Sequence, residues 1–208
     1  MNKKRVGVLI SGRGSNMEAL IRAAQAPDYP AEIVLVLSND PEAKGLEIAR
    51  SYGVAAEAID HRPFKRDRDA HERAVAARLD EAGVEIVCLA GYMRLLTPYL
   101  VGKYAGRMLN IHPSILPAFP GLDTHARAIE AGAAEHGCTV HLVTEGMDEG
   151  PILAQTAVPV LDSDDESRLA ARVLAQEHRL YPVALAAFAR QSGGVAASAD
   201  AALSNPAA

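Results

Sequence analysis

The sequence predicts an α/β protein with a doubly wound, mostly parallel, Rossmann-like sheet, helices on both of its faces and an antiparallel hairpin late in the chain. Three observations lead to this prediction. Short apolar segments alternate with segments of helical periodicity through most of the chain. Val84–Ala90 is almost entirely apolar, as expected for a parallel strand buried on both sides. Thr139–Val143 and Ile152–Val160 resemble strands and are joined by a Gly-containing turn, so they can pair as a hairpin.

The individual elements follow from apolar periodicity and from the residues that begin and end helices. The strands expected before the hairpin are Arg5–Ile10, Glu32–Leu37, Val54–Ile59, Val84–Ala90 and Arg107–Ile111. The expected helices are Ser15–Gln25, Glu42–Tyr52, Asp69–Ala82, Pro98–Tyr104, Thr124–Ala134 and Asp162–Arg190. Ser15 and Glu18 form a capping-box pattern at the first helix, and Pro182 predicts a kink or break in the last one.

The chain contains neither an internal repeat nor an interdomain linker, and its 208 residues suffice for one domain with a substantial core. We therefore expect a single domain over residues 1–191. Residues 192–208 are rich in Gly, Ala and Ser and lack an apolar face, so they predict a disordered C-terminal tail.

Composition excludes several classes of function. The net charge of -5 gives no broad basic surface for nucleic acid. The apolar stretch after the basic N-terminus is short and ends in Ser-Gly, which indicates a strand and not a signal peptide, and nothing approaches transmembrane length. Cys88 and Cys138 belong to no metal-spaced cluster. We expect a cytoplasmic protein that uses no metal, acts on small molecules and binds neither nucleic acid nor membrane, with its oligomeric state open.

The strongest chemical pattern is the pair Asn110 and His112 at the end of an expected strand. Residues two apart on a strand point to the same face. An amide and a protonated imidazole can hold a developing oxyanion, and a carboxylate such as Asp148 can orient the imidazole and keep it charged. The alternative is an ordinary structural histidine beside a turn, and local spacing alone favours that alternative.

The loop Ser11-Gly-Arg-Gly-Ser-Asn16 joins the first strand to the first helix. Glycines allow backbone amides to approach a ligand, and a helix N-terminus favours an anion. The spacing matches neither the dinucleotide fingerprint nor the P-loop. An anion-binding loop and a tight turn that needs glycine are about equally compatible with this pattern.

Blocks of sequence in a fixed order make the chain resemble the phosphoribosylglycinamide formyltransferase family over roughly residues 5–185. These blocks are Ser11–Asn16, Ser38–Asn39, Leu89–Leu96, Leu109–Leu122, Met147–Pro151 and Gln176–His178. The resemblance implies transfer of a formyl group from 10-formyltetrahydrofolate to the amine of 5-phosphoribosylglycinamide, in purine synthesis.

The resemblance also implies site residues. Catalysis falls to Asn110, His112 and Asp148, and substrate phosphate binding to Gly14, Ser15 and Asn16. Glu177 is implied to contact the same substrate, although a solvated helix face is the simpler interpretation of that residue alone. The implied folate-binding residues are Arg68, Met93, Arg94, Leu95, Leu96 and Asn110. Arg66 competes with Arg68 for its position, because this region carries one extra residue relative to the family pattern.

Asp123 stands where the family commonly has His, so it is expected to cap a helix and not to act in chemistry. His141 and the other histidines besides His112 are left out of the catalytic set, and His61 and His71 are expected at the surface. Rival interpretations are a related formyltransferase acting on another amine, such as methionyl-tRNA, a formyltetrahydrofolate hydrolase, and a nucleotide-binding module without catalysis. The first two rivals carry additional domains in their families, so the length of this chain favours the glycinamide substrate.

Overall fold

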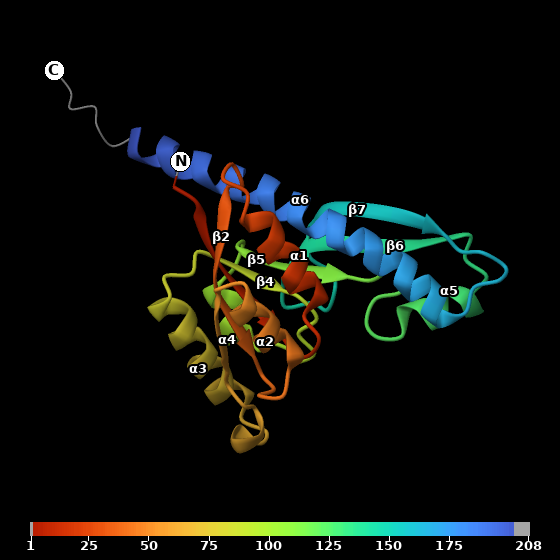
Figure 1. Ribbon diagram of the computed structural model, residues 1–208, viewed down its shortest axis with the longest axis horizontal. Helices are drawn as coiled ribbons and strands as arrows, with labels where there is room; N and C mark the ends of the chain where they lie inside the picture. The colour runs from red at the N-terminus through yellow and green to blue at the C-terminus, as the bar shows by residue number, and fades with distance from the viewer. Residues whose placement is uncertain (1, 202–208) are drawn as a thin grey trace.

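The computed structural model describes residues 2–201, and side chains as far as residue 191. The sheet is seven-stranded with the order β3-β2-β1-β4-β5-β6-β7. Neighbours from β3 to β5 are parallel, whereas β6 is antiparallel to both β5 and β7. The predicted doubly wound sheet with a late antiparallel hairpin is therefore confirmed. Figure 1 shows β6 and β7 extending away from the parallel part of the sheet.

The strands are β1 Lys4–Ile10, β2 Ala31–Ser38, β3 Ala55–Ala58, β4 Ile86–Leu89, β5 Met108–His112, β6 Glu135–Leu142 and β7 Ile152–Pro159. The α-helices are α1 Ser15–Ala24, α2 Lys44–Ser51, α3 Arg68–Glu81, α4 Pro98–Lys103, α5 Thr124–Glu130 and α6 Glu166–Ala201. A 3-10 turn, η1 Arg62–Phe64, precedes α3. Every expected element is present, most with boundaries shifted by one or two residues.

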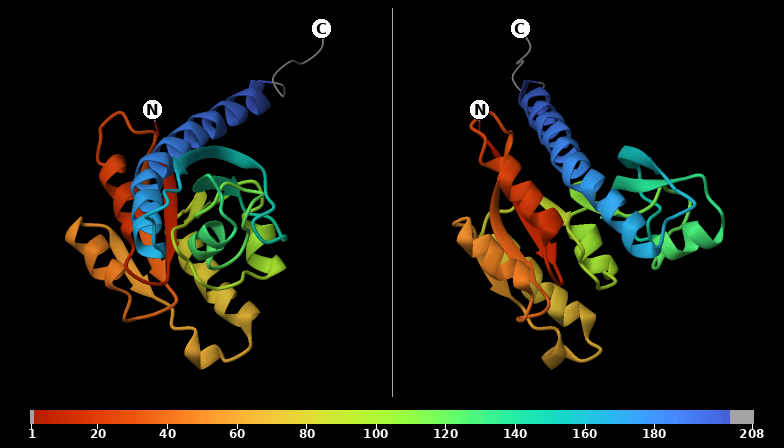
Figure 2. Two further views of the ribbon diagram at one scale, coloured as in Figure 1. Left: turned by 90° about the vertical axis from the view of Figure 1, so that its right-hand side faces the viewer. Right: turned by 45° about the vertical axis from the view of Figure 1, so that its right-hand side comes forward.

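Helices cover both faces of the sheet, so two apolar clusters form. One cluster packs α1, α2 and α6 on the sheet through residues such as Met17, Leu46 and Tyr181. The other packs α3 and α4 on the opposite face around Leu79 and Tyr104. The views in Figure 2 show α6 running along one side of the sheet, with α3 on the other side. No helix of the described residues is long and apolar enough to cross a membrane.

The order of the strands decides where a ligand can bind. β1 and β4 are neighbours in the sheet, but the chain continues from them to helices on opposite faces. Ligands of open α/β sheets bind beyond the carboxyl ends of two such strands. The Ser11–Asn16 loop follows β1, and the Met93–Leu96 segment follows β4. Asn110 and His112 lie on β5, the next strand along the sheet. The fold therefore gathers three separate sequence motifs at one edge.

Two sequence predictions about helix starts are wrong. Gly14 is the N-cap of α1, with φ 74°, and Ser15 is the first helical residue, so no Ser15–Glu18 capping box forms. Glu18 instead accepts a hydrogen bond from the Tyr52 hydroxyl. Asp123 does occupy the N-cap position of α5, but with φ 55° its side chain makes no capping hydrogen bond.

The later elements differ from expectation at three places. α5 ends at Glu130, because Gly132 takes φ 61° and the chain then enters β6 at Glu135. α6 is one helical element with Pro182 inside it, so of the expected kink or break, the break does not occur. Its backbone is helical as far as Ala201, beyond the boundary expected at residue 191, which is compatible with the high helix propensity of alanine. Residues 202–208 of the predicted tail lie outside the described residues, so the division at residue 191 stays a prediction.

Candidate active site

Asn110, His112 and Asp148 meet at the end of β5. His112 is 5% exposed, and its Nδ1 lies 3.3 Å from Oδ2 of Asp148. Its Nε2 lies 3.0 Å from the carbonyl oxygen of Phe119. Both ring nitrogens therefore face oxygen acceptors, and only the doubly protonated imidazolium can donate to both. The two contacts fix the orientation of the His112 ring.

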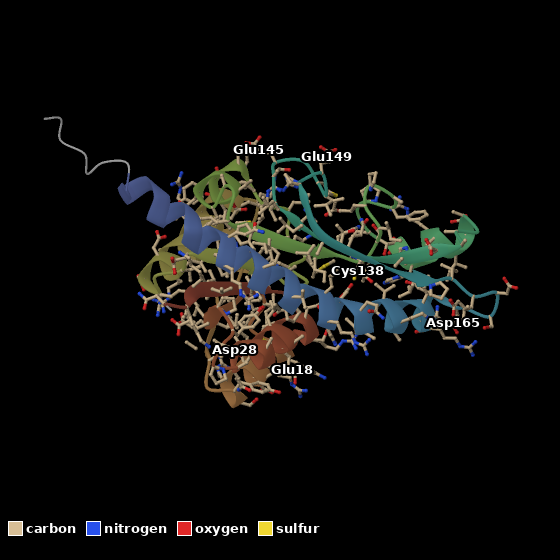
Figure 3. The ribbon with its side chains drawn as sticks, turned by 90° about the horizontal axis from the view of Figure 1, so that it is seen from above. Glu18, Asp28, Cys138, Glu145, Glu149 and Asp165 are labelled. Carbon is tan, nitrogen blue, oxygen red and sulfur yellow. The ribbon has the colours of Figure 1, made fainter. Side chains whose placement is uncertain are left out.

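Asp148 is carried by the connection between β6 and β7, with φ 57°. Its Oδ2 also accepts a hydrogen bond of 2.9 Å from the Gly121 amide. Burial acts to raise the pKa of Asp148, but hydrogen bonding to His141 and to the Gly121 amide, together with the charge of His112, lowers it overall. Asp148 is therefore held as an anion beside His112. Glu145 and Glu149, on the same connection, are exposed and project outward in Figure 3.

His141 is a member of this cluster that the sequence interpretation left out. It lies opposite Asn110 in the antiparallel pairing of β5 and β6 and is 3% exposed. Its Nε2 is 3.2 Å from Nδ2 of Asn110 and 3.6 Å from Oδ1 of Asp148. Its Nδ1 lies 2.9 Å from the Leu142 carbonyl oxygen. His141 thus connects the amide to the carboxylate. The sequence placed His141 on an expected strand, but it gave no sign that this strand pairs with the Asn-x-His strand.

The Ser11–Asn16 loop ends at the N-terminus of α1, where the first backbone N–H groups have no partner within the helix. Gly12 accepts a hydrogen bond of 3.0 Å from the amide of Gly45 at the start of α2. A Cβ at Gly45 would lie 2.5 Å from Cδ1 of Ile10 and 3.2 Å from the Cα of Gly14, so this close contact requires glycine. The loop and Gly91 and Met93 beyond β4 line a pocket of about 240 Å³.

Glu177 lies beside this loop although it is 161 positions from Asn16. Its Oε2 accepts a hydrogen bond of 2.6 Å from Nδ2 of Asn16, and both side chains are buried. Burial raises the pKa of Glu177, while the Asn16 hydrogen bond acts in the opposite direction. Oδ1 of Asn16 is buried without a hydrogen-bond partner among the described residues, so an acceptor is available to a donor from a ligand.

In the Met93–Leu96 segment, the side chains of Met93 and Leu95 are 69% and 60% exposed, whereas Leu96 packs against the core. Nη1 of Arg68 lies 3.4 Å from the carbonyl oxygen of Leu95. The Arg66 backbone carbonyl accepts a hydrogen bond from the Arg68 amide, and the Arg66 side chain makes no hydrogen bond to this segment among the described residues. Of the two arginines considered from the sequence, Arg68 is the one that contacts the segment.

Comparison with known proteins identifies the family of this chain. A model of the formyl transferase family matches residues 4–185. The chain belongs to the formyl transferase family. A crystal structure of phosphoribosylglycinamide formyltransferase from Brucella melitensis is 60% identical, with a TM-score of 0.86, covering 90% of this chain and 96% of that one. The Escherichia coli phosphoribosylglycinamide formyltransferase is 45% identical over 88% of this chain and 85% of its own length.

Larger proteins also match this formyl transferase. The trifunctional purine biosynthetic protein adenosine-3 of Drosophila pseudoobscura is 48% identical over 90% of this chain, but the match spans only 14% of its length. What the rest of that protein does is therefore not transferable to this chain.

The remaining histidines of the formyl transferase separate into buried and partly buried ones. His71, expected at the surface, is 1% exposed and its Nε2 lies 2.9 Å from the Ile59 carbonyl oxygen, so that expectation is wrong. His125 and His136 contact each other, Nδ1 to Nε2, at 3.2 Å. No group of three or more His, Cys, Asp or Glu residues among those described is arranged to hold a metal ion.

Proposed function

We propose that this formyl transferase moves the formyl group of 10-formyltetrahydrofolate to the amine of 5-phosphoribosylglycinamide, a step of purine biosynthesis. The observation that carries the proposal is the cluster at the end of β5, where His112 is held between Asp148 and the Phe119 carbonyl with Asn110 two residues away. The relatives named above support the choice of substrate.

The chemistry requires stabilisation of negative charge on the formyl oxygen when the amine attacks the formyl carbon. Asn110 and protonated His112 supply an amide and a positive charge at one face of β5. Donors that are fixed in advance stabilise such a charge without reorganisation during the reaction. His112 Nε2 also lies 3.0 Å from the Phe119 carbonyl oxygen, so in the reaction its N–H is shared between that carbonyl and the oxyanion.

Proton transfer completes the reaction. The attacking nitrogen must lose a proton and the leaving nitrogen of the folate must gain one before the carbon–nitrogen bond to the folate breaks. Asp148 holds His112 and lies near His141, and through a water molecule its carboxylate can move this proton. The step needs neither a covalent enzyme intermediate nor a metal.

The two substrates use the two loops beside the cluster. Backbone amides of Gly14, Ser15 and Asn16 at the start of α1 favour the phosphate, and Glu177 is close enough to Asn16 to contact the rest of the ribonucleotide. Met93, Arg94, Leu95 and Leu96 form the folate side, with Arg68 reaching the same segment and Asn110 between the two substrates. The protein is expected to work on these small molecules in the cytoplasm, without nucleic acid or membrane.

Release of tetrahydrofolate from 10-formyltetrahydrofolate, measured with and without 5-phosphoribosylglycinamide, tests the proposal. Release that requires the amine is expected. Equal release in its absence would indicate a hydrolase and would contradict the proposal. Release with another amine only would keep the formyl transfer and replace the acceptor.

A further inference from the structure

The hydroxyl of Ser11 joins the two loops assigned above to the two substrates. The backbone amide of Met93, beyond β4, donates a hydrogen bond of 2.8 Å to Ser11 Oγ. Ser11 Oγ in turn donates to Oδ1 of Asn39, at the end of β2, at 2.5 Å. The Ser11 amide donates to the Gly91 carbonyl at 3.2 Å. One side chain therefore connects the ends of β1, β2 and β4.

Hydrogen bonds at both ends help to fix the backbone of the Met93–Leu96 segment. Tyr92 and Leu96 pack against the apolar cluster on the α3 and α4 face, whereas the Met93 and Leu95 side chains are mostly exposed and add little packing. At the far end, the buried carboxylate of Glu72 accepts hydrogen bonds of 2.7 and 2.6 Å from the amide and hydroxyl of Thr97. The near end is held by Ser11, which also begins the Ser11–Asn16 loop.

The pocket of about 240 Å³ places this hydroxyl between the two binding regions. Its walls come from the Ser11–Asn16 loop on one side and from Ala90, Gly91 and Met93 on the other. A ligand that orders one wall acts on a residue that is hydrogen-bonded to the other wall.

We propose that Ser11 is a positioning residue that couples the two substrate sites, so that 5-phosphoribosylglycinamide on the Ser11–Asn16 loop strengthens folate binding at Met93–Leu96. This inference rests on the proposed function. Ordering one loop lowers the entropy that the second ligand must still remove, and the coupling is reciprocal. A single net hydrogen bond limits the effect to about 2- to 10-fold in affinity.

The dissociation constant of tetrahydrofolate, which carries no formyl group, measures the coupling without turnover. Titrations of the full chain by calorimetry, with and without saturating 5-phosphoribosylglycinamide, should give an affinity ratio of about 2- to 10-fold in the wild-type protein. Ser11→Ala should bring the ratio close to one. Ser51→Ala is the matched control, because the Ser51 hydroxyl likewise donates one hydrogen bond, here to the Ile48 carbonyl oxygen at 2.7 Å, but lies at the exposed end of α2. This control should keep the wild-type ratio.

Amide hydrogen exchange in the wild-type protein gives a second measurement that needs no variant. Addition of 5-phosphoribosylglycinamide alone should slow exchange of the Met93 amide several-fold. A wild-type ratio of one, a Ser11→Ala ratio equal to that of the wild type, or unchanged Met93 exchange would each overturn the coupling. Absence of ribonucleotide binding or formyl transfer in the wild-type protein would instead overturn the proposed function, and the coupling with it.

Discussion

Nδ1 of His112 lies 3.3 Å from Oδ2 of Asp148, in a place where both side chains are largely removed from solvent. Partial burial strengthens the electrostatic interaction between an imidazolium and a carboxylate relative to water. The same carboxylate oxygen is fixed by the Gly121 amide at 2.9 Å. Asp148 is therefore positioned to hold His112 both in orientation and in its charged form.

Asp148→Asn should lower kcat by about 10²-fold or more while changing substrate affinity much less, because the contacts it supports form mainly in the transition state. Loss of the negative charge disfavours the His112 imidazolium, so the remaining activity should shift toward lower pH. Steady-state kinetics across pH and NMR titration of His112 measure both effects. Near-normal kcat with an unchanged pH profile would exclude this role for Asp148.

Glu177→Gln separates stability from substrate binding. Burial raises the pKa of the Glu177 carboxyl, so ionising this group destabilises the folded protein. The stability that the neutral carboxyl provides is fully present below the unfolded-state pKa of about 4.3 and is lost as pH rises through the folded-state pKa. Gln cannot ionise and can still accept the Asn16 hydrogen bond. The variant should therefore gain in Tm relative to the wild type as pH rises from about 4 to 7, while binding 5-phosphoribosylglycinamide more weakly.

Glu130→Gln, at the exposed end of α5, is the matched control for this experiment. The Tm of this variant should follow that of the wild type across the same pH range. Its affinity for 5-phosphoribosylglycinamide should be unchanged. A Glu177→Gln protein that lost stability at neutral pH would show that the buried carboxylate is compensated by more than Asn16.

Alternating periodicity was sufficient to predict the sheet and its helices, because apolar strands such as Val84–Ala90 have no other stable place than the middle of a covered sheet. Helix starts were less predictable. The Ser15–Glu18 pattern suits a capping box, yet Gly14 takes the left-handed N-cap conformation and Glu18 pairs with Tyr52 and Arg22 instead. Which partner a side chain meets depends on tertiary packing that local sequence does not contain.

The site was predictable where the family pattern names residues and less so elsewhere. Glu177 and Asn16 are far apart in sequence, and the resemblance alone suggested that they serve one substrate; the structure gives a 2.6 Å hydrogen bond between them. The place of His141 in the site was not predicted, because its contact with Asn110 depends on the register of β5 and β6. Strand register across a long connection cannot be derived from spacing.

Ser15→Asp should weaken binding of 5-phosphoribosylglycinamide by placing a carboxylate beside its phosphate, while tetrahydrofolate binding persists. Ser15 is the first residue of α1, where an acidic residue is compatible with the helix dipole, so folding should survive. Ser167→Asp makes the same change in the exposed first turn of α6 and should bind the ribonucleotide normally. Equal affinity of Ser15→Asp and the wild type would exclude the phosphate assignment.

Gly45→Ala should displace the Ser11–Asn16 loop, because the added Cβ would lie 2.5 Å from Ile10 Cδ1 and 3.1 Å from the Gly12 carbonyl oxygen. Overpacking of this kind costs about 1–3 kcal/mol in the free energy of unfolding, and ribonucleotide affinity should fall as well. Gly102→Ala in α4 meets nothing within 4 Å and should be neutral or slightly stabilising. Denaturant unfolding measures the stability of the two variants, and calorimetry measures their affinity for the ribonucleotide. Equal stability and equal affinity would show that α2 shifts to accommodate the added Cβ without moving the loop.

Arg68→Ala and Arg66→Ala test which arginine serves the folate side. Nη1 of Arg68 lies 3.4 Å from the Leu95 carbonyl oxygen, whereas the Arg66 side chain makes no hydrogen bond to that segment among the described residues. Loss of the Arg68 guanidinium removes both this contact and a positive charge from the folate side. Its effect should be a rise of several-fold in the KM for 10-formyltetrahydrofolate, with a small change in kcat and in the KM for the ribonucleotide.

Arg66→Ala removes the same charge two residues away and should have a much smaller effect, since a solvent-exposed charge at greater distance is screened by salt. If both variants raised the folate KM equally, general attraction of an anionic ligand would explain the data better than a contact through Arg68; repeating the measurement at high salt would then abolish both effects.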